Sequence, residues 1–242
     1  MQKTIMIMGA MEDAELNLLK GKLENIEIYN ENGFFFYKGN LLDNNVILCC
    51  TKIGVINATL ATQIGILKFK PDIIIGQGIA GGHGYNVHAN DIVVGTEIIN
   101  INTIETNKKE IGEGSDSLEW KLNSFENDID ETLVIIKSDS ELIDITKNVK
   151  YEYGNVLFGR IGSGDVWNKE SDRILMFNEK YETLCEEMEG YAISKVANLY
   201  KIPMIIIRAI SNNEILNEEY NRVVGKYAQE FVLSLIEKII NS

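Results

Sequence analysis

Short apolar stretches recur along the chain, and they run continuously where a half-exposed strand would alternate with polar residues. Their β-branched composition and modest length are typical of central strands that are covered on both faces. They occupy residues 4–10, 45–51, 72–78, 91–95, 156–163 and 203–211. The pattern therefore predicts a buried central sheet.

Helical periodicity fills several of the intervals between these stretches. Leucines at three- and four-residue spacing predict a helix over 12–26. The same kind of spacing predicts helices over 56–69, 189–201 and 221–240. Strands that alternate with helices are typical of α/β proteins. We therefore predict an α/β three-layer sandwich, formed by residues 1–242 as a single domain, with helices on both sides of the sheet.

Composition places the 242-residue chain among globular proteins, with 45% hydrophobic and 24% charged residues. Lys and Arg total 23 against 36 Asp and Glu, which gives a formal net charge of −13. An acidic surface repels nucleic-acid phosphates and anionic lipid headgroups, so we expect neither nucleic acid nor membrane as a partner. No signal peptide is recognisable, and no run approaches the roughly 20 apolar residues of a membrane helix.

Cysteines and histidines are few and poorly spaced for metal binding. Cys49, Cys50 and Cys185 form no CxxC pair, and His83 and His88 are the two histidines. We therefore expect no metal site and no cofactor. Cys49 and Cys50 stand in an apolar stretch and are interpreted as core residues. An odd cysteine count without a disulfide framework fits a cytoplasmic protein.

Residues 101–131 depart from the strand and helix pattern. They are polar and poorly periodic over a length that compact domains seldom leave without structure. Two interpretations stay open, a lid or subunit-contact loop and a plain solvated excursion.

Candidate chemistry lies directly after the apolar stretches, because ligands of open α/β sheets bind at the carboxyl ends of the strands. Five motifs occupy such places, in the order GAME, GIAGG, SGDVW, EME and RAISN. Each is ambiguous alone. Glu12 in the first motif could simply stabilise a helix N-terminus, and the glycine-rich second motif lacks both the P-loop lysine and the GxGxxG spacing.

Two further features concern charge. Glu186, Glu187 and Glu189 fall at the predicted start of the helix over 189–201, where we expect one acid to face a site and the others to take cap or solvent positions. Arg208 stands at the end of a buried strand. We expect it to pair with an acid such as Glu187, because an unpaired buried charge is costly.

In this order and at these separations, the five motifs resemble those of the purine nucleoside phosphorylase/uridine phosphorylase superfamily. Within it, the chain is most similar to the methylthioadenosine/S-adenosylhomocysteine nucleosidases. The resemblance runs from residue 5 to the final helix and weakens over 101–150. It implies a mixed central sheet, a homodimer, and hydrolysis of the N-glycosidic bond of a purine nucleoside through an oxocarbenium-like transition state.

The resemblance also implies roles for individual residues. Glu12 matches the acid that activates water, and Glu189 matches the acid that accepts hydrogen bonds from the ribose hydroxyls. Met188 matches a methionine packed against the sugar. Trp167 matches an aromatic residue stacked on the purine, and Asn168 matches the residue whose backbone contacts the base edge. The predicted substrate-binding set is completed by Ile79, Ala80, Gly81 and Glu187.

Asn212, the third residue predicted to be catalytic, departs from the family pattern. The nucleosidases carry an aspartate there, which protonates purine N7, and an amide cannot act as that acid. One interpretation is a different base, since an asparagine can donate to a 6-oxo group and accept from a protonated N7. Members that act on 6-oxopurines, including futalosine hydrolases, resemble this chain in that asparagine. The neighbouring Asn213 cannot restore the acid, and Glu214 is expected to point away.

A second interpretation of Asn212 keeps an adenine nucleoside as the ligand. It would then be cleaved slowly, or bound by a homologue with weak catalysis, or trapped by an engineered residue. Sequence alone leaves both interpretations open.

Water and phosphate are the alternative nucleophiles. Phosphorylases of the superfamily hold phosphate with arginines drawn largely from the first half of the chain, and this chain has none before Arg160. Ile79 also stands where a serine or threonine commonly helps to bind phosphate or water. Hydrolysis is therefore favoured, with a phosphate-dependent phosphorylase as the alternative. Lys52 is the one basic residue that could complete a phosphate site.

Overall fold

The computed structural model describes residues 3–125 and 133–240. The strands are β1 (Thr4–Gly9), β2 (Glu24–Glu31), β3 (Phe34–Leu41), β4 (Asn44–Cys50), β5 (Ile73–Gly82), β6 (Ile92–Asn100), β7 (Ile104–Glu105), β8 (Lys121–Leu122), β9 (Ile135–Lys137), β10 (Val156–Ser163), β11 (Thr183–Glu187) and β12 (Met204–Asn212). The α-helices are α1 (Asn17–Lys20), α2 (Val55–Phe69), α3 (Ser140–Thr146), α4 (Ser171–Tyr181), α5 (Gly190–Leu199) and α6 (Val224–Ile240). None of these described helices is long and apolar enough to cross a bilayer.

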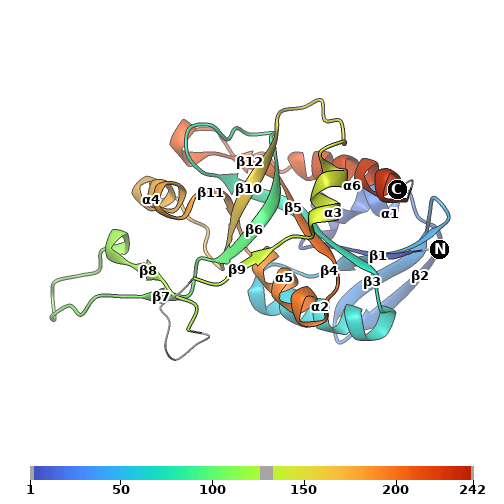
Figure 1. Ribbon diagram of the computed structural model, residues 1–242, viewed down its shortest axis with the longest axis horizontal. Helices are drawn as coiled ribbons and strands as arrows, with labels where there is room; N and C mark the ends of the chain where they lie inside the picture. The colour runs from blue at the N-terminus through green and yellow to red at the C-terminus, as the bar shows by residue number, and fades with distance from the viewer. Residues whose placement is uncertain (1–2, 126–132, 241–242) are drawn as a thin grey trace.

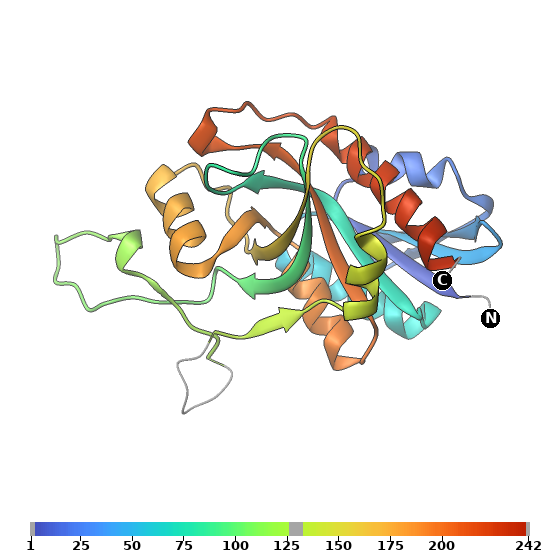
Figure 2. The ribbon, with the colours of Figure 1, turned by 45° about the horizontal axis from the view of Figure 1, so that its top comes forward.

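A mixed sheet runs through the centre of the molecule in the order β11-β10-β6-β12-β5-β1-β4-β3-β2, with β9 paired to β6 (Figure 1). Successive residues of a strand point to opposite faces, so a continuous apolar run serves two cores. On β1, Ile5 and Ile7 join one core, whereas Met6 and Met8 join the other. Helices α1, α3 and α6 cover the first face, and α2 and α5 cover the second (Figure 2). The predicted α/β sandwich is confirmed.

Five strands of the sheet close into a ring. Strand β11 pairs with β10 in parallel and also with β5 in antiparallel fashion, which joins the two ends of the series β11-β10-β6-β12-β5. Glu186 on β11 lies opposite Gly81 on β5, and Asn212 on β12 lies opposite the same glycine. Ring closure therefore brings three segments that are distant in sequence to one place.

All six apolar stretches form strands as predicted, and the helices predicted over 56–69, 189–201 and 221–240 are present as α2, α5 and α6. The helix predicted over 12–26 is wrong beyond Lys20, because residues 24–31 pair with β3 as strand β2. The hairpin turn uses Asn32 and Gly33, both with positive φ. Asn-Gly is a strong signal for such a turn, and it overrides the leucine spacing.

Part of the polar segment 101–131 leaves the body of the molecule as an extended arm, seen at the left of Figure 1. The short strands β7 and β8 pair with each other, and a helical turn, η2 (Ser117–Glu119), lies between them. Residues 126–131 of the segment lie outside the described residues. None of the described residues of the arm lines the pocket considered below.

Candidate active site

A pocket lies at the carboxyl ends of β5, β11 and β12, where the ring closes. Nine of the ten residues predicted for the site line it. They are Ile79, Ala80, Gly81, Trp167, Asn168, Glu187, Met188, Glu189 and Asn212. The tenth, Glu12, does not line the pocket, and the carboxylate found there instead belongs to Glu15.

Glu12 and Glu15 have opposite environments. The Glu12 side chain is 35% exposed and its Oε1 lies 2.7 Å from Lys20 Nζ. Hydrogen bonds with Lys20 and Tyr37 lower the pKa of Glu12. Glu15 is 2% exposed and faces the pocket. A carboxylate with a lowered pKa, paired with a lysine and partly solvated, is a poor base. The structure therefore does not support Glu12 as the residue that activates water.

A π-helical turn places Glu15, and not Glu12, toward the pocket. The turn, η1, covers Glu12–Leu16, and the N–H of Asn17 bonds the carbonyl of Glu12 five residues earlier. In a regular α-helix, residue 12 would lie on the same face as Leu16 and Leu19, both of which are fully buried. The extra residue of a π turn changes which side chains face the same side of the helix. Such turns are frequent at functional sites. Glu15 therefore takes the inward position.

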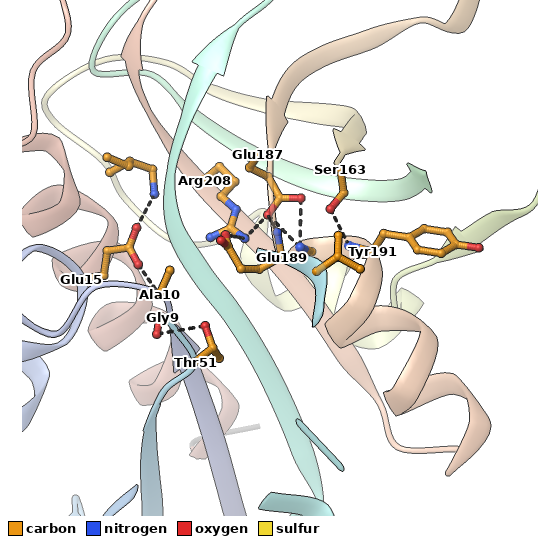
Figure 3. Close-up of polar contacts among 12 residues, drawn as sticks. Gly9, Ala10, Glu15, Thr51, Ser163, Glu187, Glu189, Tyr191 and Arg208 are labelled. Carbon is orange, nitrogen blue, oxygen red and sulfur yellow. Dashed lines mark hydrogen bonds and ion pairs between the residues drawn. The ribbon is translucent and has the colours of Figure 1, made fainter. Parts of the chain in front are cut away.

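Three backbone N–H groups hold the Glu15 carboxylate. Ala10 and Met11 donate to Oε2 at 2.6 and 3.0 Å, and Ile79 donates to Oε1 at 3.2 Å. Figure 3 shows the bond to Ala10. Burial raises the pKa of Glu15, although the charge of Arg208 and the three N–H donors oppose that shift. A fixed carboxylate with raised proton affinity is suited to accept a proton from water.

Arg208 is the cation of the site and is 1% exposed. Its Nη2 bonds Glu187 Oε2 and lies 3.5 Å from Glu189 Oε2 (Figure 3). Glu187 also accepts the N–H of Gly190 at 2.7 Å. The pairing of Arg208 with Glu187 expected from the sequence is present, and it compensates a charge that would otherwise be buried alone.

Glu189 stands at the N-cap of α5 and accepts the N–H of Gly54 at 3.0 Å. Burial raises the pKa of Glu189 to about 8, with the charge of Arg208 opposing the shift and that of Glu187 adding to it. Three acids, including Glu15, thus surround one guanidinium. Like charges at short range disfavour full ionisation, so the carboxylates of Glu187 and Glu15 add to the rise in the pKa of Glu189.

The expectation that only one of Glu186, Glu187 and Glu189 faces a site is wrong. All three line the pocket and are 9%, 6% and 6% exposed. The reason is that β11 continues to Glu187, so Glu186 and Glu187 close a strand, and only Glu189 stands at the N-cap of α5. Pairing of β11 with β5 then places the strand end beside the pocket.

Asn212 ends the buried strand β12 and is 8% exposed. Its Oδ1 accepts a hydrogen bond from Ser211 Oγ at 2.8 Å, and its Nδ2 donates to Glu214 Oε1 at 3.3 Å. The expectation that Glu214 points away is wrong, because the helical turn η3 (Glu214–Leu216) returns it toward Asn212. The second N–H of the amide has no acceptor among the described residues, so it is available to a ligand.

Trp167 and Tyr220 form an aromatic part of the pocket lining. Their ring centroids lie 5.4 Å apart with the planes tilted by 53°. Trp167 follows β10 and is 61% exposed, whereas Tyr220 precedes α6. A flat, apolar ligand could cover such a surface.

Comparison with known proteins decides the family. The family model described as "Phosphorylase superfamily" matches residues 4–240. The chain belongs to the phosphorylase superfamily. The resemblance found in the five sequence motifs is thereby confirmed.

Relatives within the phosphorylase superfamily are similar over their whole length. The 5'-methylthioadenosine/S-adenosylhomocysteine nucleosidase of Bacillus cytotoxicus is 31% identical over 95% of this chain and 93% of its own. That of Bacillus licheniformis is 30% identical over 97% of this chain and 99% of its own. The crystal structure of the Neisseria meningitidis nucleosidase in complex with methylthio-immucillin-A is 27% identical, with a TM-score of 0.79 over 97% of this chain and 99% of that one.

The described lining of the pocket lacks the cations that a phosphate-binding member of the phosphorylase superfamily needs. No lysine or arginine is among the described residues that line the pocket. Lys52 Nζ lies 5.2 Å from the ring centroid of Phe34, and Arg160 bonds Glu97. Arg208 is already paired with two acids. A phosphate dianion needs charged donors, so the pocket is better suited to a neutral nucleophile.

Eight pocket residues were not predicted from the sequence, and four of them have polar side chains, namely Glu15, Glu186, Ser211 and Tyr220. Ser211 belongs to a recognised motif and Glu15 follows one by three residues, so their nearness to a strand end was the available signal. Tyr220 lies in a connection without a motif. Glu186 was noted only as one of three neighbouring acids, because its place in the pocket depends on the pairing of β11 with β5.

Proposed function

We propose that the protein is a purine nucleosidase that uses water to cleave the N-glycosidic bond of a purine nucleoside. The names of its relatives at 30% and 31% identity support this activity. The observation that carries the proposal is the Glu15 carboxylate, held by three N–H groups in a pocket whose described lining offers no cation for phosphate.

In the proposed mechanism, Glu15 accepts a proton from the water that attacks C1′ of the ribose. The ribosyl group develops positive charge as the bond to the base breaks. Glu189 accepts hydrogen bonds from the ribose hydroxyls and stabilises that charge, because a nearby carboxylate attracts a cation strongly in a dry pocket. Arg208 and Glu187 hold Glu189 in place. Met188 packs against the sugar.

At the other end of the proposed complex, Trp167 stacks on the purine, and the backbone of Asn168 contacts its edge. The segment Ile79–Gly81 passes beneath the nucleoside. Asn212 binds the leaving base through hydrogen bonds of its amide. An amide is not an acid, so it does not transfer a proton to N7. The departing base therefore takes its proton from solvent or leaves with its charge stabilised by hydrogen bonds.

Release of free base from candidate nucleosides tests the activity. The purified protein should be incubated with methylthioadenosine, S-adenosylhomocysteine, inosine and futalosine, each with and without phosphate. We expect base and free pentose at a rate independent of phosphate. Formation of a ribose 1-phosphate, with no turnover when phosphate is left out, would support the phosphorylase alternative.

A second candidate function is nucleoside binding with little catalysis, and the amide of Asn212 is the observation that favours it. The variant Asn212→Asp provides the contrast. A large gain in the cleavage of adenine nucleosides would show that the amide alone had silenced an otherwise complete site. Tight binding of nucleosides without turnover by either protein would support the binding function.

Gly78 and Gly81 of β5 differ in the room that each leaves for a side chain. A Cβ on Gly78 would lie 2.6 Å from Glu15 Oε1 and would overlap Arg208 Nη1. A Cβ on Gly81 would meet nothing within 4 Å, so Gly81 forms part of the floor of the open pocket.

Alanine at Gly78 should therefore affect mainly the stability of the fold, whereas alanine at Gly81 should affect mainly the binding of the base. We expect Gly78→Ala to lower the free energy of unfolding by about 1–3 kcal/mol, because overpacking displaces the acid and the arginine. Gly81→Ala should change it by less than about 0.5 kcal/mol and should weaken the binding of adenine or hypoxanthine. Urea denaturation and calorimetric titration measure the two effects. Equal destabilisation by both variants would contradict the difference in space.

The pH dependence should follow Glu189. Its raised pKa of about 8 means that the carboxyl is protonated below that pH, whereas the ribose hydroxyls need the ionised form. We expect kcat/KM to rise with pH up to about 8, since that ratio reports the pKa of the free protein. Between its ordinary value of 4.5 and 8, the folded state binds the proton more tightly, so the free energy of unfolding should fall as pH rises.

The variant Glu189→Gln is the control for both measurements. The variant should lower activity. It should also remove the contribution of Glu189 to the pH dependence of kcat/KM and of the free energy of unfolding. A kcat/KM that is flat from pH 6 to 8 in the unaltered protein would rule out the assignment.

We further propose a homodimer that forms through α2. Ile56, Leu60 and Leu67 recur at helical spacing on this helix and are 72%, 49% and 60% exposed. Ile53, just before α2, lines the pocket and is 53% exposed, which supports a partner subunit beside the site. Light scattering should give twice the chain mass of 27.3 kDa, and a monomeric mass would contradict the dimer.

A further inference from the structure

Asp165, in the SGDVW motif, has no task in the mechanism above. It follows β10 in the loop that carries Trp167. The N–H of the preceding residue, Gly164, donates to the carbonyl of Glu187 at 2.8 Å. The Asp165 carboxylate is bonded to a different element, since its Oδ1 accepts the N–H of Val55 at 2.8 Å. The loop therefore connects the end of β11 with the first turn of α2.

The first turn of α2 has no cap of its own. Its N-cap residue is Gly54, which has no side chain to accept a backbone N–H and has a φ of 102°, a value that favours glycine. Asp165 supplies the missing acceptor from outside the helix. A Cβ on Gly54 would lie 3.1 Å from Asp165 Oδ1, so the two residues are closely packed. A carboxylate at this place also interacts favourably with the positive end of the helix dipole.

The chain enters this turn through a strained residue. Lys52 has a φ of 62°, in the left-handed region that residues other than glycine seldom adopt. Such a conformation persists only where its surroundings fix it. Thr51 Oγ1 fixes it on one side by donating to the carbonyl of Lys52 at 2.8 Å. On the other side, the bond between Val55 and Asp165 fixes the start of α2.

The same turn holds Glu189. The N–H of Gly54 donates to Glu189 Oε1 at 3.0 Å, and the next N–H along the chain, that of Val55, donates to Asp165. Two consecutive N–H groups thus bind two acids that lie 135 and 110 positions away in the sequence. Because one turn carries both donors, the orientation of the bond to Glu189 depends on the bond to Asp165.

We propose that Asp165 is a positioning residue for Glu189, because it fixes the first turn of α2 in the place where the Gly54 N–H meets the ribose-binding carboxylate. The inference rests on the proposed nucleosidase function and adds to it a residue outside the pocket. Asp165 is exposed and is not part of the pocket lining. It acts on the site only through the backbone of α2.

Four groups face the Glu189 carboxylate, namely Arg208 from β12, Glu187 from β11, Glu15 from η1 and the N–H of Gly54 from α2. Burial raises the pKa of Glu189, whereas the charge of Arg208 and the Gly54 N–H oppose that rise. Loss of the Gly54 bond would leave a less stable carboxylate, so Glu189 would keep its proton to higher pH.

Asp165→Ala tests the proposal through the pH dependence of kcat/KM. We expect the rising part of the profile to move up by about one pH unit, since a hydrogen bond to a charged group corresponds to about one unit of pKa or more. The value of kcat/KM should therefore fall by roughly 10-fold at about pH 7 and approach that of the unaltered protein at about pH 10. Asp165→Asn should recover most of the loss, because an amide oxygen also caps a helix N-terminus.

Asp139→Ala is the matched control. Asp139 caps α3 in the same way, since it accepts the N–H of Leu142 at 3.0 Å, and it lies outside the pocket. Its loss should lower the midpoint of urea denaturation about as much as the loss of Asp165 does. The pH profile of kcat/KM should stay that of the unaltered protein.

A carbon-13 NMR titration of the Glu189 carboxyl separates this inference from the proposed function, because it needs no turnover. The signal is assigned by its loss in Glu189→Gln. A midpoint that rises in Asp165→Ala and not in Asp139→Ala would support the inference even if no nucleoside were cleaved, a result that would refute the hydrolase alone. An unchanged midpoint in Asp165→Ala, an equal shift in Asp139→Ala, or no recovery in Asp165→Asn would overturn the inference.

Discussion

Replacement of Glu15 by glutamine should reduce kcat for nucleoside hydrolysis by about 1000-fold, the range of a lost general base. The amide preserves the size of the side chain but cannot take a proton from water. Three N–H donors now hold the carboxylate, so the variant should remain folded, with one of these bonds facing the amide nitrogen. Base release under saturating substrate, together with a thermal unfolding curve, measures the effect.

Glu12→Gln is the matched control, because Glu12 is three residues away and outside the pocket. Its loss breaks a partly exposed ion pair with Lys20 and should leave kcat close to that of the unaltered protein. The opposite result, with Glu12→Gln inactive and Glu15→Gln active, would return the water-activating role to the residue predicted from the sequence motif.

Replacement of Arg208 by methionine should lower the free energy of unfolding by about 3–5 kcal/mol, as expected when one partner of a buried ion pair is removed. The cation is 1% exposed, and its loss leaves Glu187 and Glu189 without their compensating charge. Activity should also fall, since Glu189 would retain its proton to higher pH. Urea denaturation followed by circular dichroism measures the loss of stability.

The exposed pair of Arg222 with Asp13 supplies the comparison. The two groups lie 2.6 Å apart, with side chains 49% and 65% exposed. Exposed pairs contribute at most about 1 kcal/mol, so Arg222→Met should have little effect. If both arginine variants were destabilised equally, burial would not be the reason for the importance of Arg208.

Six of the ten described strands of the central sheet could be predicted because their signal is local. A run such as 203–211 is apolar on both faces, and each face has its own core to fill. Strand β2 lacked that signal, since it lies at the edge of the sheet and most of its residues are exposed. Strand β11 was missed for another reason. Its closing acids favour a helix start until the pairing with β5 is known.

The site could be predicted in part for a similar reason. Residues at the carboxyl ends of strands, such as Gly81 and Asn212, meet in any sheet of this kind. The motif resemblance, however, assigns the water-activating role to Glu12, the acid that directly follows Gly9-Ala10-Met11. A single π turn, which packs against the sheet and α6, presents Glu15 to the pocket in place of Glu12.

The sequence by itself determined the α/β fold, the family, the strand ends at which a ligand binds, and the amide at position 212. These follow from hydrophobic patterning and motif order, which are properties of neighbouring residues. Tertiary structure alone decided that Glu15 enters the pocket and that Glu186 faces Asn212 across Gly81. Both depend on helix rotation and ring closure, which bring together residues as distant in sequence as Glu15 and Asn212 through contacts that no local pattern encodes.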